Sequence, residues 1–255
     1  MRIFLTVLML WPGLSLGQMN EADVVILGEV HDNPAAHLGQ AQALKELTPN
    51  AVVFEMLSAE AAEAANSVRP SDIAAVTGWA DSGWPDFALY APIFEALGHA
   101  QIVGAAPLRV QVRAAFADGA FVIMGPDGRR FGLDQSLSGS EQAMREALQS
   151  TAHCDAMPQE AMSGMVEAQR FRDAAFAAAT LAALRDFGAP VAVITGNAHA
   201  RTDWGVPAMI ASASPDTTVY SIAFAETPPD APYDEVRLVP IVDRSDSCGQ
   251  FSKKK

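Results

Sequence analysis

The chain has 255 residues and half of them are hydrophobic, so it is long enough to bury a large core. It carries 30 acidic and 17 basic side chains, which give a formal net charge of −13. A surface that binds nucleic acid needs clustered cations, and basic residues cluster only at Lys253, Lys254 and Lys255. We therefore expect no nucleic-acid partner.

The first 17 residues have the features of an export signal. A lone cation precedes an apolar run (3–11), and Ser15 and Gly17 have the spacing of a signal-peptidase site. The run is too short to span a bilayer as a stable helix. Gln18 stands where a lipoprotein would carry its lipidated cysteine. The sequence predicts a cleaved signal peptide (1–17), no stable membrane anchor, and a periplasmic or secreted protein.

Five short runs rich in β-branched residues follow along the chain without polar alternation. Such runs are typical of strands that are covered on both faces, as in a parallel sheet. Alanine-rich segments with helical spacing separate them, so we predict an α/β fold with a central, mostly parallel sheet and flanking helices. The expected strands lie at 24–27, 52–54, 102–103, 191–194 and 219–223.

Two longer helical segments, at about 58–97 and 138–187, are predicted to cover the end of the sheet as a helical lid. With no linker or repeat in the mature chain, we expect a single domain (20–245) and a C-terminal tail (246–255). Cys154 and Cys248 are the only cysteines. In an oxidising compartment they are expected to form a disulfide, although two unrelated thiols are the alternative.

The helix after the first strand has a clear start. Asp32 and Asn33 can cap it, and Pro34 suits its first turn. His37 falls on the face of this helix that carries its apolar residues, so we expect it to point towards the end of the sheet.

The most informative motif occurs twice, as an apolar strand that ends in Gly-x-x-His. Gly28 precedes His31 in the first copy, and Gly196 precedes His199 in the second. Ligands of open α/β sheets bind beyond the carboxyl ends of the strands, so both imidazoles should converge on one crevice. Glycine at each turn allows a close backbone approach or a positive φ angle.

Carboxylates are expected at the same place. Glu29 lies between the first glycine and histidine, and Glu55 ends the second strand. Glu29, His31, Glu55 and His199 could ligate a divalent metal or act as acid and base. Asp173 lies in the apolar stripe of the last long helix and needs a buried partner. That partner must be a cation, a histidine or a hydrogen-bonding cluster, and Arg201 is the natural candidate, in a structural ion pair or in the site.

The motifs resemble those of the ChaN-like haem-binding uptake proteins, which group with the erythromycin esterases and the Tiki/TraB proteins. The resemblance covers about 22–220, nearly all of the mature chain. It is carried by the sequences LGEVHDNP with His37 following, FEM, GWP through YAP, QRFRD, and GNAHAR with GVP.

The resemblance implies haem binding during iron acquisition, in a homodimer that encloses haem, with a tyrosine as iron ligand. Tyr90 is the best placed of the three tyrosines. The expected cofactor-binding residues are His31, His37, Trp84, Tyr90, Asp173, Asn197, His199 and Arg201. The expected partner is therefore haem or another small-molecule ligand.

The relatives that hydrolyse their substrates imply an alternative, a His/Glu-dependent hydrolase, in some cases with a divalent metal. His31 would then be the general base, and His199 and Arg201 would stabilise the oxyanion. Glu29 and Glu55 would orient the imidazoles or hold the metal.

Overall fold

The computed structural model describes residues 13–244 and Cys248. The predicted signal peptide lies mostly on residues 1–12, outside the described residues, as does the tail apart from Cys248. The described part begins with helix α1 (Gly13–Glu21). No helix within residues 13–244 combines the length and the apolar character needed to cross a membrane.

The core of the fold is a six-stranded sheet with the order β3-β2-β4-β1-β5-β6, and every neighbouring pair is parallel. All five predicted runs are strands. The sixth, β6, was missed because it lies at the edge of the sheet, where half-buried charged residues alternate with exposed apolar ones. The strands are β1 (Val24–Glu29), β2 (Ala51–Phe54), β3 (Gln101–Gly104), β4 (Val191–Gly196), β5 (Val219–Ala225) and β6 (Glu235–Leu238).

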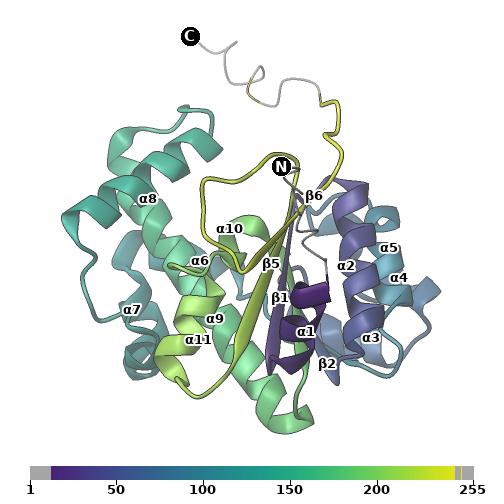
Figure 1. Cartoon of the computed structure of the whole chain (residues 1–255). Coiled ribbons are helices and arrows are strands. Elements are labelled where there is room, and N and C mark those ends of the chain that lie inside the picture. The colour runs from purple at the N-terminus through teal and green to yellow at the C-terminus, as the bar shows by residue number, and fades with distance from the viewer. Residues whose placement is uncertain (1–12, 245–247, 249–255) are drawn as a thin grey trace, which may run out of the picture.

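Helices cover both faces of the sheet, as the predicted α/β class requires (Figure 1). Alternate strand residues point to opposite faces, so Val25 and Leu27 join one apolar core and Val24 and Ile26 join the other. The first face is covered by α1, α2 (Pro34–Leu47), α3 (Ala59–Asn66), α4 (Ile73–Val76) and α5 (Phe87–Glu95), with the 3-10 turns η1 (Pro70–Asp72) and η2 (Trp79–Asp81).

The second face is covered by the long helix α9 (Met162–Phe187) and its neighbours. These are α6 (Arg109–Asp118), α7 (Ala120–Met124), α8 (Gly139–Ala152), α10 (Asn197–Ala200) and α11 (Val206–Ala213), with η3 (Gly125–Phe131) and η4 (Gln159–Ala161). The segments predicted as a lid thus pack on opposite faces of the sheet, as α3 to α5 and as α8 and α9. Their action as a lid stays a prediction.

The chain changes direction between the neighbouring strands β1 and β4. After β1 it enters α2 on the first face, whereas after β4 it continues through α10 into α11 on the second face. Such a switch point opens a crevice at the carboxyl ends of the two strands. Asn33 caps α2, since its side-chain oxygen accepts from the backbone nitrogens of Ala35 and Ala36 at 2.9 and 3.2 Å.

The expected disulfide is present. Cys154, just after α8, is joined to Cys248 with a Cα–Cα distance of 5.4 Å. The two cysteines are 94 residues apart, so the bond links the C-terminal segment to the helices of the second face.

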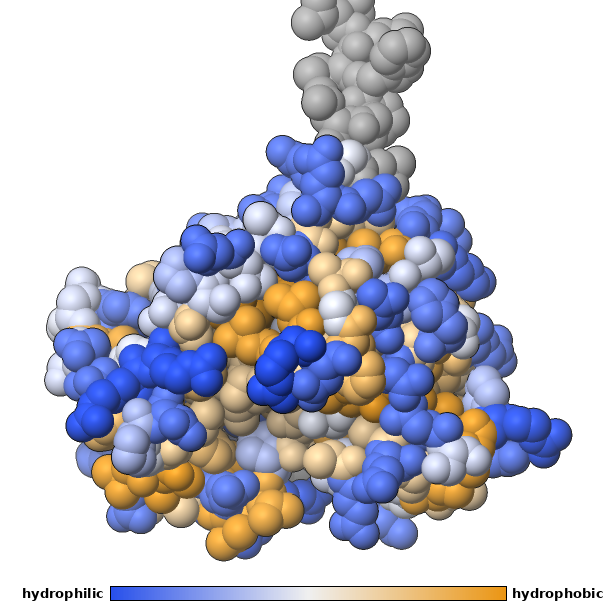
Figure 2. Space-filling model, turned by 90° about the horizontal axis from the view of Figure 1, so that it is seen from below, coloured by the Kyte–Doolittle hydropathy of each residue, from blue (hydrophilic) through white to orange (hydrophobic). Residues whose placement is uncertain are grey.

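Some large hydrophobic side chains are exposed. Figure 2 shows one face of the molecule, where hydrophobic residues (orange) gather in patches between hydrophilic ones (blue). On α7, Val122 is 65% exposed. Near the start of α6, Leu108 is 63% and Val110 67% exposed.

Candidate functional site

The ends of β1, β2 and β4 bring the predicted site residues together. Glu29 is paired with Gly196 across the sheet, and the backbone nitrogen of Glu55 donates to the carbonyl of Ile194 on the neighbouring strand. A Cβ atom on Gly196 would lie 2.9 Å from His31 Nε2 and 3.8 Å from Glu55 Oε2. A glycine is therefore needed at position 196 because the side chains of His31 and Glu55 come close to its backbone, and not because the position has a positive φ.

Glu29 lies at the centre of the first cluster and is almost completely buried. Its Oε1 accepts from His31 Nδ1 and from the Tyr90 hydroxyl, both at 2.8 Å, and its Oε2 lies 3.2 Å from His37 Nδ1. Burial alone would raise the pKa of Glu29, but hydrogen bonding to His31 and the nearness of His37 outweigh it and lower the pKa. Glu29 is thus a carboxylate that fixes the orientation of its partners.

His31 is the member of this cluster that can reach a ligand. Its side chain is 38% exposed, and its ring meets the ring of Trp84 edge-on at a centroid distance of 5.0 Å. Burial would lower its pKa, but the hydrogen bond to Glu29 raises it. With Nδ1 held by Glu29, Nε2 is left without a hydrogen bond to any described residue.

Tyr90 and His37 are positioned differently from the expected ligands. Both are fully buried. The Tyr90 hydroxyl donates to Glu29, and burial first, then the charge of Glu29, raises its pKa well above the usual value. His37 Nε2 lies 2.9 Å from the carbonyl oxygen of His31. In this arrangement both side chains hold Glu29 and His31 in place, and Tyr90 is not among the residues that line the cavity beside the site.

Glu55 is the centre of the second cluster. Its Oε1 accepts from Arg172 Nη2 at 2.5 Å and lies 3.5 Å from His199 Nε2. Its Oε2 accepts from the Thr195 hydroxyl and the Gly196 backbone nitrogen at 2.7 and 2.8 Å. Burial would raise the pKa of Glu55, but the charges of His199 and Arg172 dominate and lower it to about 2.

Asp173 finds its buried partner in His199. Its Oδ1 lies 2.6 Å from His199 Nδ1, and burial raises the pKa of Asp173. Of the expected partners it is the histidine that is present, whereas the natural candidate Arg201 lies just after α10 and pairs elsewhere. There it donates to both carboxylate oxygens of Asp203 at 3.0 and 2.7 Å and lies over the ring of Trp204.

Asn197 donates to the carbonyl of Phe224 at 2.9 Å, so its side chain ties α10 to β5. Within the described residues, no three or more His, Cys, Asp or Glu side chains are grouped to hold a metal ion, and metal ligation by Glu29, His31, Glu55 and His199 stays a prediction. The four residues lie in two neighbouring clusters, around Glu29 and around Glu55, in which each carboxylate is occupied by its own partners.

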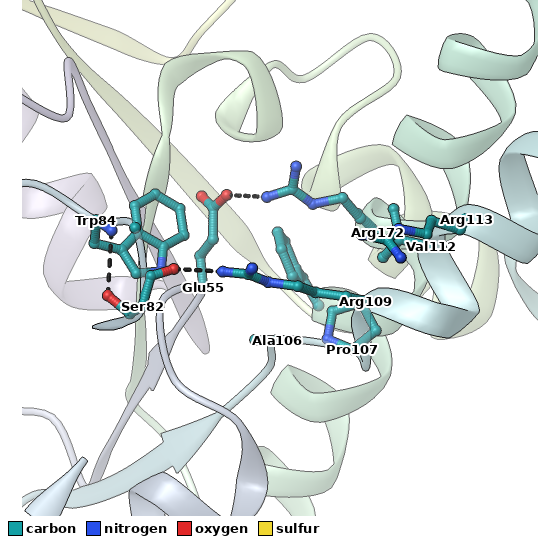
Figure 3. A pocket seen from close by; sticks show the side chains of 11 residues that line it. Glu55, Ser82, Trp84, Ala106, Pro107, Arg109, Val112, Arg113 and Arg172 are labelled. Atoms are coloured by element: carbon teal, nitrogen blue, oxygen red, sulfur yellow. Dashed lines mark hydrogen bonds and ion pairs between the residues drawn. The ribbon is translucent and has the colours of Figure 1, made fainter. Parts of the chain in front are cut away.

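A cavity of about 500 Å³ opens beside these clusters. Figure 3 shows Arg109 and Arg172 reaching into it from α6 and α9 towards Ser82 and Glu55. The cavity has mixed walls, because apolar and aromatic side chains alternate with cations. The residues that line it include Glu55, Trp84, Pro107, Arg109, Val112, Arg113, Arg172 and Phe176.

The cavity carries three arginines and one glutamate, opposite in sign to the molecule as a whole. Arg109 donates to the Ser82 carbonyl at 2.6 Å, and Arg172 is paired with Glu55. Arg113 is exposed and has no ion-pair partner among the described residues. Sequence reasoning missed all three arginines as site residues; only Arg172 gave a signal, since it is next to Asp173.

The comparisons with known proteins agree with this fold. The family model described as "Haem-binding uptake, Tiki superfamily, ChaN" matches residues 15–210. The chain belongs to this family. None of the curated proteins compared with the sequence matches it.

A solved structure of the same family has a similar fold. It is described as "Cofacial heme binding to ChaN of Campylobacter jejuni", is 19% identical, and superposes with a TM-score of 0.65 over 84% of this chain and 86% of that chain. The type III effector HopBA1 is also similar, at 16% identity and a TM-score of 0.40, over 83% of this chain and 81% of that chain.

Proposed function

We propose that the protein binds haem in the arginine-lined cavity, outside the cytoplasm, as part of haem uptake. One observation carries the proposal: three arginines and apolar side chains line a cavity whose wall residue Trp84 contacts the imidazole of His31, and Nε2 of that imidazole has no hydrogen bond to a described residue. The cavity volume lies within the range of about 300 to 1,000 Å³ that is usual for small-molecule sites. The family, and the haem binding described for the similar ChaN of Campylobacter jejuni, support haem as the ligand.

The donor set fits both parts of a haem. Guanidinium groups bind carboxylates in two-point contacts, so Arg109 and Arg113 suit the propionates. Trp84, Val112 and Phe176 offer apolar and aromatic surface to the porphyrin. Histidine is a common axial ligand of haem iron.

His31 is the proposed iron ligand in place of Tyr90. A histidine that ligates a metal usually donates its other ring nitrogen to a carboxylate, which fixes the tautomer and raises ligand basicity. Glu29 provides that carboxylate at 2.8 Å. Tyr90 has its hydroxyl on the same carboxylate and is buried beneath it.

The homodimer also belongs to this proposal. Leu108 and Val110 are exposed at the start of α6, next to the lining residues Arg109 and Val112. An apolar rim around a ligand cavity is suited to being covered by a second copy of the chain. A haem bound there would be shielded from water on its open side.

A hemin titration followed by visible spectroscopy tests the proposal. We expect the wild-type protein to bind hemin with a shifted Soret band. His31→Ala should change the position of that band and weaken binding at least about tenfold, because the protein loses its iron ligand. Arg113→Gln should keep the wild-type band but weaken binding, because a contact to a propionate is lost.

Tyr90→Phe is the matched comparison, since it removes one oxygen from the same cluster. Its spectrum should remain that of the wild type. A wild-type protein that leaves the hemin spectrum unchanged would contradict haem binding. A band altered by Tyr90→Phe and unaffected by His31→Ala would assign the iron to the tyrosine instead.

The second candidate function is ester or amide hydrolysis. It is favoured by the His31–Glu29 pair, because a histidine held by a carboxylate and open at Nε2 can act as a general base. The expected result is cleavage by the wild type that stops in His31→Ala. Equal inactivity of both proteins on a broad panel of esters would refute it.

A further inference from the structure

A second, smaller cavity lies closer to the N-terminal end of α9 than the first. Its volume is about 220 Å³. α9 sends Arg172 and Phe176 to the first cavity, whereas Val166 and Gln169 line the second. The remaining walls come from α8, from the segment after β4 and from Tyr233 between β5 and β6. Because the volume lies below the usual range for drug-sized ligands, the cavity suits a smaller molecule.

The second cavity contains a buried cation with an unused donor. Arg145 is only 8% exposed, and both its Nε and its Nη2 donate to Glu141. Its Nη1 is buried and has no hydrogen-bond partner in the described residues. Buried donors are almost always satisfied, because an unmet one costs about 1 to 3 kcal/mol. The unused guanidinium nitrogen at this cavity wall is therefore available to an acceptor that enters the cavity.

The rest of the cavity is mainly apolar. Leu148, Trp204 and Tyr233 line it, and the guanidinium of Arg145 lies 4.8 Å from the centre of the Trp204 ring. Arg201, also in the wall, is placed over the same ring at 3.7 Å. A flat apolar body beside the indole and one acceptor towards Arg145 would match this arrangement.

The carboxylates near this cavity already have cationic partners, so the cavity can accept a negatively charged ligand. Glu141 is paired with Arg145, and Asp203 with Arg201. Asp173, on the same helix α9, is paired with His199, whose Nδ1 lies 2.6 Å from its Oδ1. A ligand carboxylate would therefore meet two cations whose opposing charges are already paired, and it would gain a charge-assisted hydrogen bond from Nη1.

We propose that this second cavity binds a small aromatic carboxylate, with its ring beside Trp204 and its carboxylate on Arg145 Nη1. The proposal is independent of haem binding, which belongs to the other cavity. Gln169 connects the second cavity to the second cluster, because its Nε2 lies 3.0 Å from His199 Nδ1.

Phenylacetate is the probe, and phenylacetamide is its neutral match. The measurement is the NMR signal of the Trp204 indole N–H, identified by its loss in Trp204→Phe. We expect phenylacetate to shift this signal in a saturable way at low-millimolar concentration or below. Phenylacetamide should bind at least about tenfold more weakly, because the charge-assisted bond is lost.

Three variants complete the test. Arg145→Gln should weaken phenylacetate binding about tenfold or more. Ala152→Phe fills the cavity from an exposed position on α8 and should abolish binding even if Arg145→Gln fails to fold. Arg113→Gln, in the first cavity, should leave binding unchanged. No saturable shift, equal binding of the amide, or unaltered binding by Ala152→Phe would overturn the proposal.

Discussion

Glu55 has four polar partners at the end of β2 although its side chain is almost completely buried. Its pKa of about 2 lies below the ordinary value of 4.5. A carboxyl whose pKa is lower in the folded state stabilises the fold above the ordinary value. This stabilisation is lost as the pH falls towards the folded-state value.

Replacement of Glu55 by glutamine should show this dependence. At neutral pH we expect Glu55→Gln to lower the free energy of unfolding by up to about 3 kcal/mol relative to the wild type. The difference should shrink as the pH falls from 4.5 to 2, because the wild-type carboxyl becomes protonated. Urea denaturation across this pH range measures it.

Glu95→Gln provides the control, since Glu95 is an exposed carboxylate at the end of α5. Its stability relative to the wild type should hardly change over the same pH range. If the difference in unfolding free energy between the wild type and Glu55→Gln is as independent of pH as that for Glu95→Gln, the ion pairs of Glu55 do not stabilise the fold.

The residues nearest the strand ends were predictable from the sequence. Glu29, His31 and Glu55 directly follow apolar runs, and parallel strands place their carboxyl ends at one edge. Whether a histidine or an arginine would partner Asp173 was not predictable. His199 and Arg201 are two residues apart, and the short helix α10, which contains His199 and ends just before Arg201, directs His199 towards α9.

At the scale of elements, the cavity depends on the spacing of α6 and α9. Gly164 lies where the two helices approach each other most closely, because a Cβ there would be 2.7 Å from the Phe116 carbonyl oxygen and 2.9 Å from its ring. α6 supplies Arg109 and Arg113 to the cavity, and α9 supplies Arg172. The glycine thus sets the distance between the two cationic walls.

Gly164→Ala should force the helices apart. We expect the free energy of unfolding to fall by about 1 to 3 kcal/mol, as for other overpacked contacts, and hemin binding to weaken. Gly139→Ala is the control, because a Cβ at Gly139 in α8 meets nothing within 4 Å. Thermal denaturation of both variants measures the difference, and an equally stable Gly164→Ala would contradict the close contact.

The sequence predicted the strands better than the cavity. Five of six strands could be recognised, since strands buried on both faces are continuous apolar runs. Only β6 lacked that pattern. The arginines of the cavity come from helices far apart in the chain, and helical periodicity alone does not define how two helices pack.

At the scale of the whole molecule, the disulfide closes a loop that spans the second half of the chain. Its two cysteines are 94 residues apart. The chain-entropy model gives up to about 4 to 5 kcal/mol of stabilisation for such a loop. The bond therefore ranks among the largest single contributions to stability that the fold contains.

The double variant Cys154→Ser, Cys248→Ser should unfold at a lower temperature than the wild type. The wild type should lose a similar amount of stability when a reductant is added, because its unfolded chain gains the same freedom. The reductant should have no effect on the double variant. Equal melting temperatures of the oxidised wild type and the double variant would show that the cross-link adds nothing.

The opposite signs of the cavity and of the whole chain have a consequence for how an anionic ligand arrives. At physiological ionic strength the field of a charge is screened beyond roughly 8 Å. Outside that range of the arginines, a dianion that diffuses towards this acidic molecule meets only the weak, screened repulsion of its net negative charge. Added salt should thus speed the approach of the ligand while it weakens the attraction between the ligand and the arginines. The rates of binding and of release should therefore both rise with ionic strength.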